Sequence, residues 1–458
     1  MADIDPPAQP VTDLGARFPR THGEMAALRE QGTVAARDLC AFIDRSPTPF
    51  HAVREAVSRL AAAGFREISE GDAWSLAPGD RRYLIRGGST LIAFVAGAES
   101  PATGGFRMIG AHTDSPNLRV KPNADVARSG FQQVGVEVYG GVLQTTWLDR
   151  DLSIAGRVLC RPHAGEREIV SHLVDLQGPV ARVANLAIHL NRGVNKDGLV
   201  LNEQKHLVPI VGLGKEAALR AALARALEIG EDTIVGYDLS LYDTERAAIG
   251  GLHGEFVFSA RLDNLASCHA ATTALAAATA PSPATRLIAL YDHEECGSRS
   301  AVGAAGSVLR DAVTRIVEAH ADRQPQALGR AMARSLLVSA DMAHGVHPNY
   351  PEQHEPQHAP LVNRGLVIKS NVNQSYATDG ATAAAFELSC EEAGFSPQRF
   401  VVRSDLPCGS TIGPITAAAL GVATVDVGSP MLSMHSCREM AGTLDVHLAI
   451  EAFKASLG

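Results

Sequence analysis

The chain reads Phe106-Arg-Met-Ile-Gly-Ala-His-Thr-Asp-Ser-Pro116, an apolar run followed by a polar turn. The run 106–109 predicts a buried strand, and His112 and Asp114 come directly after it. On an extended backbone, residues two apart point to the same side, so the Asp114 carboxylate can orient the His112 imidazole as an outer partner. Taken alone, the same pair can simply close a loop before Pro116.

Polar side chains also follow three other apolar runs. They are Glu294 and Glu295 after 287–291, Asp341 and His344 after 336–338, and His435 a little beyond 423–427. In open α/β sheets the loops that leave parallel strands converge on one edge, where ligands bind. We therefore expect these side chains to gather at one place.

The order of elements predicts the fold class. Strand-like segments such as 286–291 and 336–340 alternate with helical ones such as 264–279 and 380–393, which is typical of an α/β domain. We expect a mostly parallel central sheet flanked by helices, interrupted by a β-rich insertion long enough to be a separate domain. The expected parts are a flexible N-terminal tail at 1–33, a catalytic domain at 34–122 and 256–458, and the insertion at 123–255.

Length and composition limit the function. A chain of 458 residues is longer than the length at which a single hydrophobic core usually stops growing, so two domains are expected. The net charge of -9 argues against nucleic acid as the main partner. The seven cysteines include no C-x-x-C pair, which favours a reducing, cytoplasmic compartment. No signal peptide is read, and no apolar run approaches the roughly 20 residues that span a bilayer, so no membrane partner is expected.

Histidine, aspartate and glutamate together suit zinc or manganese. Asp263 precedes a predicted helix and can place one oxygen on each of two metals, although Asp is also a common helix cap. Of the adjacent Glu294 and Glu295, one can bind metal while the other takes a proton from water, the plain alternative being a solvated acidic turn. Viewed alone, His435 is most simply a surface histidine. Together these residues indicate metal-assisted hydrolysis.

With these motifs in order, the chain resembles the aspartyl aminopeptidase family of cocatalytic zinc metallo-aminopeptidases, of the tetrahedral aminopeptidase type. The motifs that carry the resemblance extend over nearly the whole chain, at 46–53, 110–122, 139–152, 186–192, 339–350, 405–414 and 428–440. The resemblance implies removal of an N-terminal Asp or Glu from peptides. It also implies two zinc ions per subunit, replaceable by Mn²⁺ or Co²⁺, with the ligands His112, Asp263, Glu295, Asp341 and His435.

The resemblance also assigns roles outside the ligand set. It implies that Glu294 is the general base, that Asp114 orients a ligand, and that His344 steadies the carbonyl oxygen as it becomes an oxyanion. At the substrate, it places Lys369 against the acidic side chain, with Tyr376 nearby.

Family members form homododecamers built from dimers, in which the inserted domain pairs protomers and a histidine reaches the neighbouring active site. His189 is our candidate for that histidine, and His206 is the second.

Two alternatives stay open at this point. The metal motifs do not say which end of a peptide is bound, so a carboxypeptidase or dipeptidase on the same bimetal core is one alternative. An inactive oligomeric peptide-binding scaffold is the other. The presence of every proposed ligand together with Glu294 favours an active enzyme, and Lys369 with the whole-chain resemblance favours the amino end.

Overall fold

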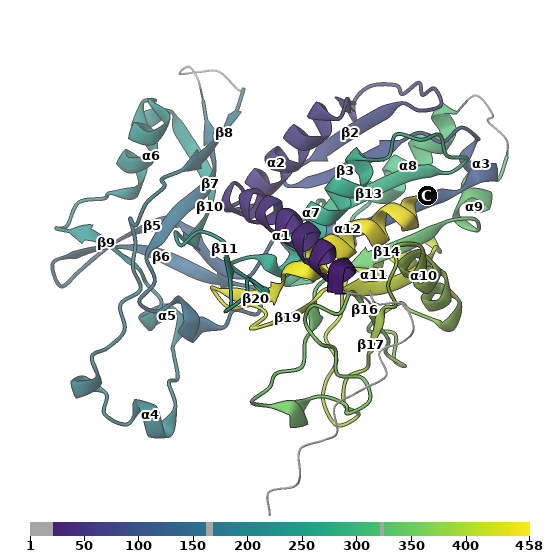
Figure 1. Cartoon of the computed structure of the whole chain (residues 1–458). Coiled ribbons are helices and arrows are strands. Elements are labelled where there is room, and N and C mark those ends of the chain that lie inside the picture. Colours follow the sequence, from purple (N-terminus) through teal and green to yellow (C-terminus); the bar gives the residue numbers. More distant parts are fainter. Residues whose placement is uncertain (1–21, 162–167, 321–324) are drawn as a thin grey trace, which may run out of the picture.

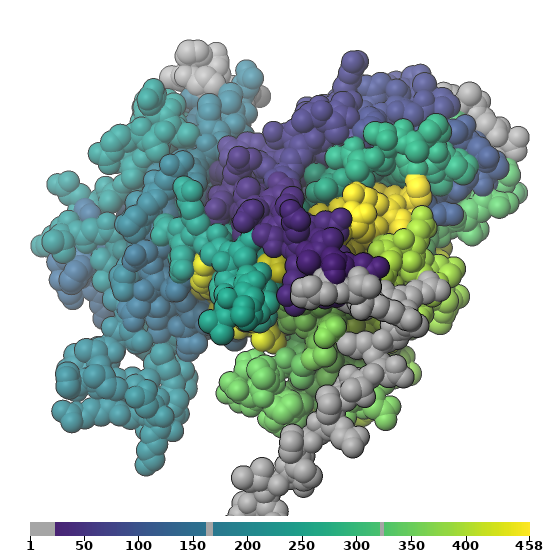
Figure 2. Space-filling model, viewed as in Figure 1, coloured from purple at the N-terminus to yellow at the C-terminus, as the bar shows by residue number. Residues whose placement is uncertain are grey.

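The computed structural model describes residues 22–161, 168–320 and 325–458, whose strands form three sheets. A nine-stranded sheet and its helices make the larger lobe, a six-stranded sheet makes a second lobe beside it, and a small five-stranded sheet lies between them (Figure 1). The two lobes are also distinct in the space-filling view, where the segment around α4 (Val194–Asp197) projects from the smaller lobe (Figure 2).

The nine-stranded sheet is mixed, not mostly parallel as predicted. Its strands, in spatial order, are β1 (Arg66–Glu67), β2 (Arg81–Arg86), β3 (Thr90–Val95), β13 (Thr285–Tyr291), β4 (Phe106–His112), β14 (Leu336–Ala340), β18 (Ala423–Gly428), β16 (Val367–Lys369) and β17 (Gln398–Phe400). The inner strands β13, β4, β14 and β18 are parallel. Antiparallel pairs lie outside them: β2 with β3, β3 with β13, and β16 with β18. The tight turn at Gly87 and Gly88, both with positive φ, joins β2 to β3 and permits only antiparallel pairing.

Helices cover both faces of this sheet. One face packs against α1 (His22–Asp44), α2 (Pro49–Ala62), α7 (Leu262–Ala276), α10 (Gly380–Glu392) and α12 (Thr443–Leu457), and the other against α3 (Pro101–Gly104), α8 (Val308–Ala319), α9 (Ala327–Met332) and α11 (Ile412–Leu420). Along β4, Ile109 and Ala111 belong to the first core and Met108 to the second. Burial of both faces explains why these strands read as nearly continuous apolar runs. Among the described helices, none has the length and apolar character needed to cross a membrane.

Helix α1 begins at His22, so residues 22–33 are helical and do not belong to the flexible tail predicted for 1–33. Residues 1–21 of that predicted tail lie outside the described residues. Residues 22–33 include few bulky apolar residues, which hid the helical pattern, but their two alanines, two glutamates and Arg29 favour helix. Leu28 packs against the first core and anchors this end of the helix.

The six-stranded sheet is antiparallel and has its own apolar core. Its order is β8 (Val170–Asp175), β7 (Leu152–Cys160), β10 (Ile234–Asp243), β5 (Asn117–Arg128), β6 (Phe131–Tyr139) and β9 (Ile210–Leu213), and it is accompanied by α4, α5 (Glu203–His206), α6 (Leu219–Leu227), η1 (Gln144–Trp147), η2 (Ile188–Leu190) and η3 (Glu231–Thr233). The sheet spans 117–243, whereas the expected insertion spans 123–255. We propose that 117–243 form the inserted domain.

The five-stranded sheet brings the last part of the chain beside the insertion. Its strands are β11 (Ala248–Gly250), β12 (Phe256–Ser259), β20 (Glu439–Gly442), β19 (Pro430–Leu432) and β15 (Ala343–His344), and a further short helix, η5 (Pro351–Gln353), follows β15 in the chain. The turn between β19 and β20 carries His435. This small sheet therefore places His435, from the last part of the chain, close to residues of the nine-stranded sheet.

His51 is a buried histidine of α2 that makes stability depend on pH. Burial, and then the charge of Arg54, lowers its pKa from 6.5 to about 4, and its Nδ1 lies 2.8 Å from the Thr48 hydroxyl oxygen. Between these pH values the folded state binds fewer protons than the unfolded chain, so stability falls as the pH falls through this window. Acidification from pH 6.5 to 5 should cost about 2 kcal/mol through this residue.

His51→Gln keeps a polar side chain that cannot be protonated, so we expect the variant to lose less stability than the wild type over this range. The measurement is the denaturant midpoint of metal-free wild type and variant at pH 6.5 and pH 5. Parallel pH dependence in the two proteins would show that His51 is protonated without cost.

Candidate metal centre

Six acidic and imidazole side chains gather where the inner parallel strands end. His112 is the last residue of β4, Asp341 follows β14, Glu294 and Glu295 begin η4 (Glu294–Cys296) after β13, Asp263 lies in the first turn of α7, and His435 lies between β19 and β20. His112 and Tyr291, the last residues of the parallel strands β4 and β13, lie side by side. The loops that follow the two strands therefore leave the sheet at the same edge. The sheet edge therefore collects residues that are far apart in the sequence.

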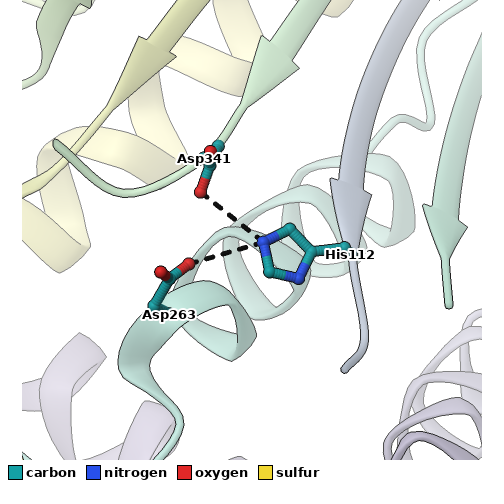
Figure 3. A group of neighbouring side chains, drawn as sticks. All are labelled: His112, Asp263 and Asp341. Carbon is teal, nitrogen blue, oxygen red and sulfur yellow. Dashed lines mark ion pairs between the residues drawn. The ribbon is translucent and has the colours of Figure 1, made fainter. Parts of the chain in front are cut away.

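The first group consists of His112, Asp263 and Asp341 (Figure 3). His112 Nε2 lies 3.4 Å from Asp263 Oδ1 and 3.5 Å from Asp341 Oδ1. His112 is 1% exposed and Asp263 3% exposed. These three side chains converge on one buried point.

The second group consists of Asp263, Glu295 and His435. His435 Nε2 lies 3.3 Å from Asp263 Oδ2 and 3.5 Å from Glu295 Oε2. Asp263 therefore presents one carboxylate oxygen to His112 and the other to His435. This is the arrangement that a carboxylate shared between two metals requires.

The donor atoms fit divalent cations. Within each group the potential ligand atoms lie within 4.8 Å of one another. Among the described residues, Asp263 Oδ1 and Glu295 Oε1 are buried carboxylate oxygens that lack a hydrogen-bond partner, which is costly unless a cation satisfies them. Three nitrogen and oxygen ligands with one open position is the set that catalytic zinc uses. The residues present thus fit divalent cations such as zinc.

Burial and neighbouring charges shift the pKa values of the acidic side chains of the site in different directions. Burial would raise the pKa of Asp263, but the His112 and His435 imidazoles lower it. Burial, and to a lesser degree the neighbouring carboxylates, raises the pKa of Glu294 to about 7 and that of Glu295 well above its usual value. A carboxylate with a pKa near neutrality is suited to accept and return a proton.

Asp114 connects His112 to the glutamate turn. Its carboxylate accepts hydrogen bonds from the backbone N–H groups of Glu294 and Glu295, at 3.2 and 3.1 Å, and from the Tyr139 hydroxyl at 2.5 Å. His112 Nδ1 lies 3.0 Å from the backbone carbonyl oxygen of Asp114, its hydrogen-bond acceptor, and 3.4 Å from Asp114 Oδ1. Asp114 therefore fixes the turn that carries both glutamates as well as the ring of His112.

Glu439 is a site residue to which sequence reasoning assigned no role. It is 2% exposed, and its two carboxylate oxygens accept hydrogen bonds from the backbone N–H groups of Asp263, at 3.1 Å, and of His435, at 2.7 Å. Glu439 therefore fixes the backbone at Asp263 and His435, two of the three members of the second group. Its only signal in the sequence is its place in the motif 428–440.

Lys369 lies next to Asp341 of the first group, and Tyr376 lies next to Lys369. The Lys369 ammonium donates to the backbone carbonyls of Asp341, at 2.9 Å, and of Met342, at 3.2 Å, and lies 5.1 Å from the centre of the Tyr376 ring. Lys369 is 2% exposed. His344, by contrast, is exposed and lines a cavity of about 430 Å³ together with residues that include Phe400 and Met434.

His189 and His206 are exposed residues of the inserted part, in η2 and at the end of α5. Neither belongs to the groups of neighbouring potential metal ligands in the described parts of the chain. The structure of one protomer therefore does not bring either histidine to its own metal centre.

A mixed sheet covered by helices, with overlapping groups of nitrogen and oxygen donors at its edge, is typical of metal-dependent hydrolytic enzymes. The family model of the aminopeptidase I zinc metalloproteases (M18) matches residues 42–456. The chain belongs to this family and is a metallo-aminopeptidase. Among the alternatives from the sequence, a carboxypeptidase or dipeptidase is thereby excluded.

Relatives and solved structures agree with this assignment. The chain is 49% identical over 425 residues to the probable M18 family aminopeptidase 2 of Pseudomonas aeruginosa, covering 91% of this chain and 96% of that protein. Its fold is similar to that of a chain in the complex of Ape4 and Nbr1, with a TM-score of 0.90, 38% identity and coverage of 95% and 87% of the two chains. It is also similar to the mApe1 dodecamer of S. cerevisiae, with a TM-score of 0.81, 32% identity and coverage of 92% and 95%.

Proposed function

We propose that this aminopeptidase uses two zinc ions to remove an N-terminal Asp or Glu from peptides. The observation that carries the proposal is the Asp263 carboxylate, which lies between the His112 and His435 imidazoles, each accompanied by a further carboxylate. When bound, two zinc ions would polarise the scissile carbonyl and lower the pKa of a water molecule.

The residues of the chain divide the remaining work. Glu294, partly buried beside both groups, takes the proton of the attacking water and passes it to the leaving amine. Asp114 keeps His112 oriented through its backbone carbonyl and its carboxylate, both of which face Nδ1. His344 is exposed at the wall of the neighbouring cavity, where its ring can donate to the carbonyl oxygen as negative charge develops there.

Lys369 is the proposed selector of an acidic side chain. An ammonium can donate three hydrogen bonds, and the carbonyls of Asp341 and Met342 accept two from Lys369. The third donor is available to a substrate carboxylate, in competition with Asp341 Oδ2 at 3.5 Å. A positive charge in a buried environment favours a negatively charged substrate far more than a solvated lysine does.

Lys369→Met removes the charge and keeps an unbranched apolar side chain. We expect kcat/KM for N-terminal Asp amides to fall about 100-fold, because one charge-assisted hydrogen bond is lost, while Leu amides change much less. The measurement is the ratio of the two kcat/KM values in wild type and variant, with zinc content determined in parallel. An equal loss on both substrates together with loss of zinc would mean that Lys369 serves only to hold Asp341.

We further propose that the chain assembles into a homododecamer built from dimers, with His189 reaching a neighbouring active site. The dodecamer of the similar mApe1 supports this, as do the exposed apolar side chains of Leu186, Ile188 and Leu190 around His189. The seven free cysteines support a reducing, cytoplasmic location. The inactive-scaffold alternative is disfavoured because all five proposed ligands and Glu294 converge.

A further inference from the structure

The inserted domain contacts side chains of the metal centre through a short segment at the end of β6, Tyr139-Gly140-Gly141, called here the 139–141 segment. Close to it, the Leu143 backbone N–H donates to the His435 backbone carbonyl at 3.1 Å. We propose that this segment is a positioning element that holds His435, Glu295 and Asp114, so that the inserted domain completes the metal centre of its own chain. The inference rests on the proposed function, because it assumes that these side chains serve bound zinc.

Gly141 sets the state and position of His435. The His435 Nδ1 atom lies 3.0 Å from the Gly141 carbonyl oxygen, which can only accept a hydrogen bond, so Nδ1 carries the proton. Nε2 is then free to bind metal, and Nε2 is the atom that faces Asp263 and Glu295. A Cβ atom at Gly141 would lie 3.1 Å from His435 Nδ1, so a methyl group there would require the ring to shift by a few tenths of an ångström.

Gly140 packs directly on Glu295. Its φ of +72° is a conformation that side chains other than glycine rarely adopt. A Cβ atom there would lie 3.0 Å from the Glu295 Cβ. Glycine is therefore required both by the backbone and by the closeness of the glutamate.

Tyr139 supports the site through Asp114. Its hydroxyl donates to Asp114 Oδ2 at 2.5 Å, and the Arg119 guanidinium carbon lies 3.9 Å from the centre of the Tyr139 ring. Because Asp114 accepts from the backbone of Glu294 and Glu295, the phenol stabilises the turn that carries both glutamates. Three consecutive residues of the inserted domain thus reach three side chains of the centre.

The contacts are unequal between the two groups of ligands. A Cβ atom at Gly140 or Gly141 would meet Glu295 or His435, which belong to the second group, whereas Asp341 and His112 complete the first group with Asp263. Perturbing Gly141 should therefore weaken one zinc site much more than the other.

The test is a zinc titration of metal-free wild type and Gly141→Ala, followed by calorimetry and by metal analysis after dialysis. We expect two bound zinc ions in the wild type and one in the variant, with affinity at the second site reduced by about 10- to 100-fold. Gly236→Ala is the matched control, since it lies in β10 of the same sheet and its added Cβ would meet only Leu159 Cδ1, at 3.8 Å. The control should bind two zinc ions.

Tyr139→Phe is the second variant, and thermal unfolding of the metal-free proteins reports on folding. We expect its zinc affinity to fall about tenfold, as for loss of other outer partners of metal ligands, while the metal-free variant still unfolds in one cooperative transition. If Gly141→Ala does not fold, Tyr139→Phe decides. Wild-type zinc affinity and stoichiometry in the folded variants would overturn the inference. A wild type that binds fewer than two zinc ions would instead refute the proposed function.

Discussion

Glu294→Gln is expected to lower kcat for N-terminal Asp amides by about 1000-fold and to leave zinc content unchanged. Glu294 lies outside the two groups that share Asp263, although with His112 and Glu295 it forms a third group of neighbouring potential ligands. Because the proposed ligand set does not include Glu294, its replacement should leave the zinc content unchanged. Glutamine has the same shape but cannot accept the proton of the attacking water. General bases typically contribute about 10²- to 10⁴-fold to turnover, which sets the expected size.

The measurement is kcat with a chromogenic Asp amide, together with metal analysis of the same sample. Glu387→Gln is the matched control, because Glu387 lies in α10 and pairs with Arg399 at 2.6 Å, outside the metal groups. The control should keep wild-type kcat. Near-normal turnover of Glu294→Gln would assign the proton transfer to another group.

Asp263→Asn should have the second large effect, with zinc loss and a fall in kcat/KM of at least about 100-fold, above the range seen for outer partners of metal ligands. Asp263 is the one side chain common to both groups, and one oxygen faces each imidazole. Asparagine removes the negative charge and replaces one oxygen with an amide N–H₂ group that cannot bind metal. Both zinc ions should therefore be held more weakly.

Metal analysis after dialysis, together with kcat/KM at saturating zinc, measures this effect. Asp38→Asn is the control, because Asp38 also pairs with a buried histidine, His269 at 2.7 Å, yet belongs to neither metal group. Two tightly held zinc ions in Asp263→Asn would contradict a shared carboxylate.

Much of the fold follows from local pattern. The apolar runs near 106–109, 287–291, 336–338 and 423–427 all lie within inner strands, because burial on both faces leaves little room for polar residues. The mixed direction of the sheet was missed, since strand direction depends on connections such as the turn at Gly87 and on distant pairing. The start of α1 was missed because few of its first residues face the core.

The site, too, contains residues that the sequence predicts and residues that it does not. Residues such as His112 and Asp341 stand directly after strands, so the rule that strand ends converge is enough to bring them together. Glu439 acts on the backbone of Asp263, 176 residues away in the chain, and no periodicity predicts such a contact. The role of the 139–141 segment could not be predicted for the same reason, because it depends on the contacts of its glycines with Glu295 and His435.

The most direct test of the two-zinc, acid-selective aminopeptidase is hydrolysis of Asp, Glu and Leu amides by wild-type protein. Each substrate is assayed as purified, after chelation, and after return of measured zinc. We expect kcat/KM for Asp or Glu about 100-fold above that for Leu, loss of activity on chelation, and full recovery at two zinc ions per chain. Equal hydrolysis of Leu and Asp amides, or full activity in the metal-free protein, would contradict it.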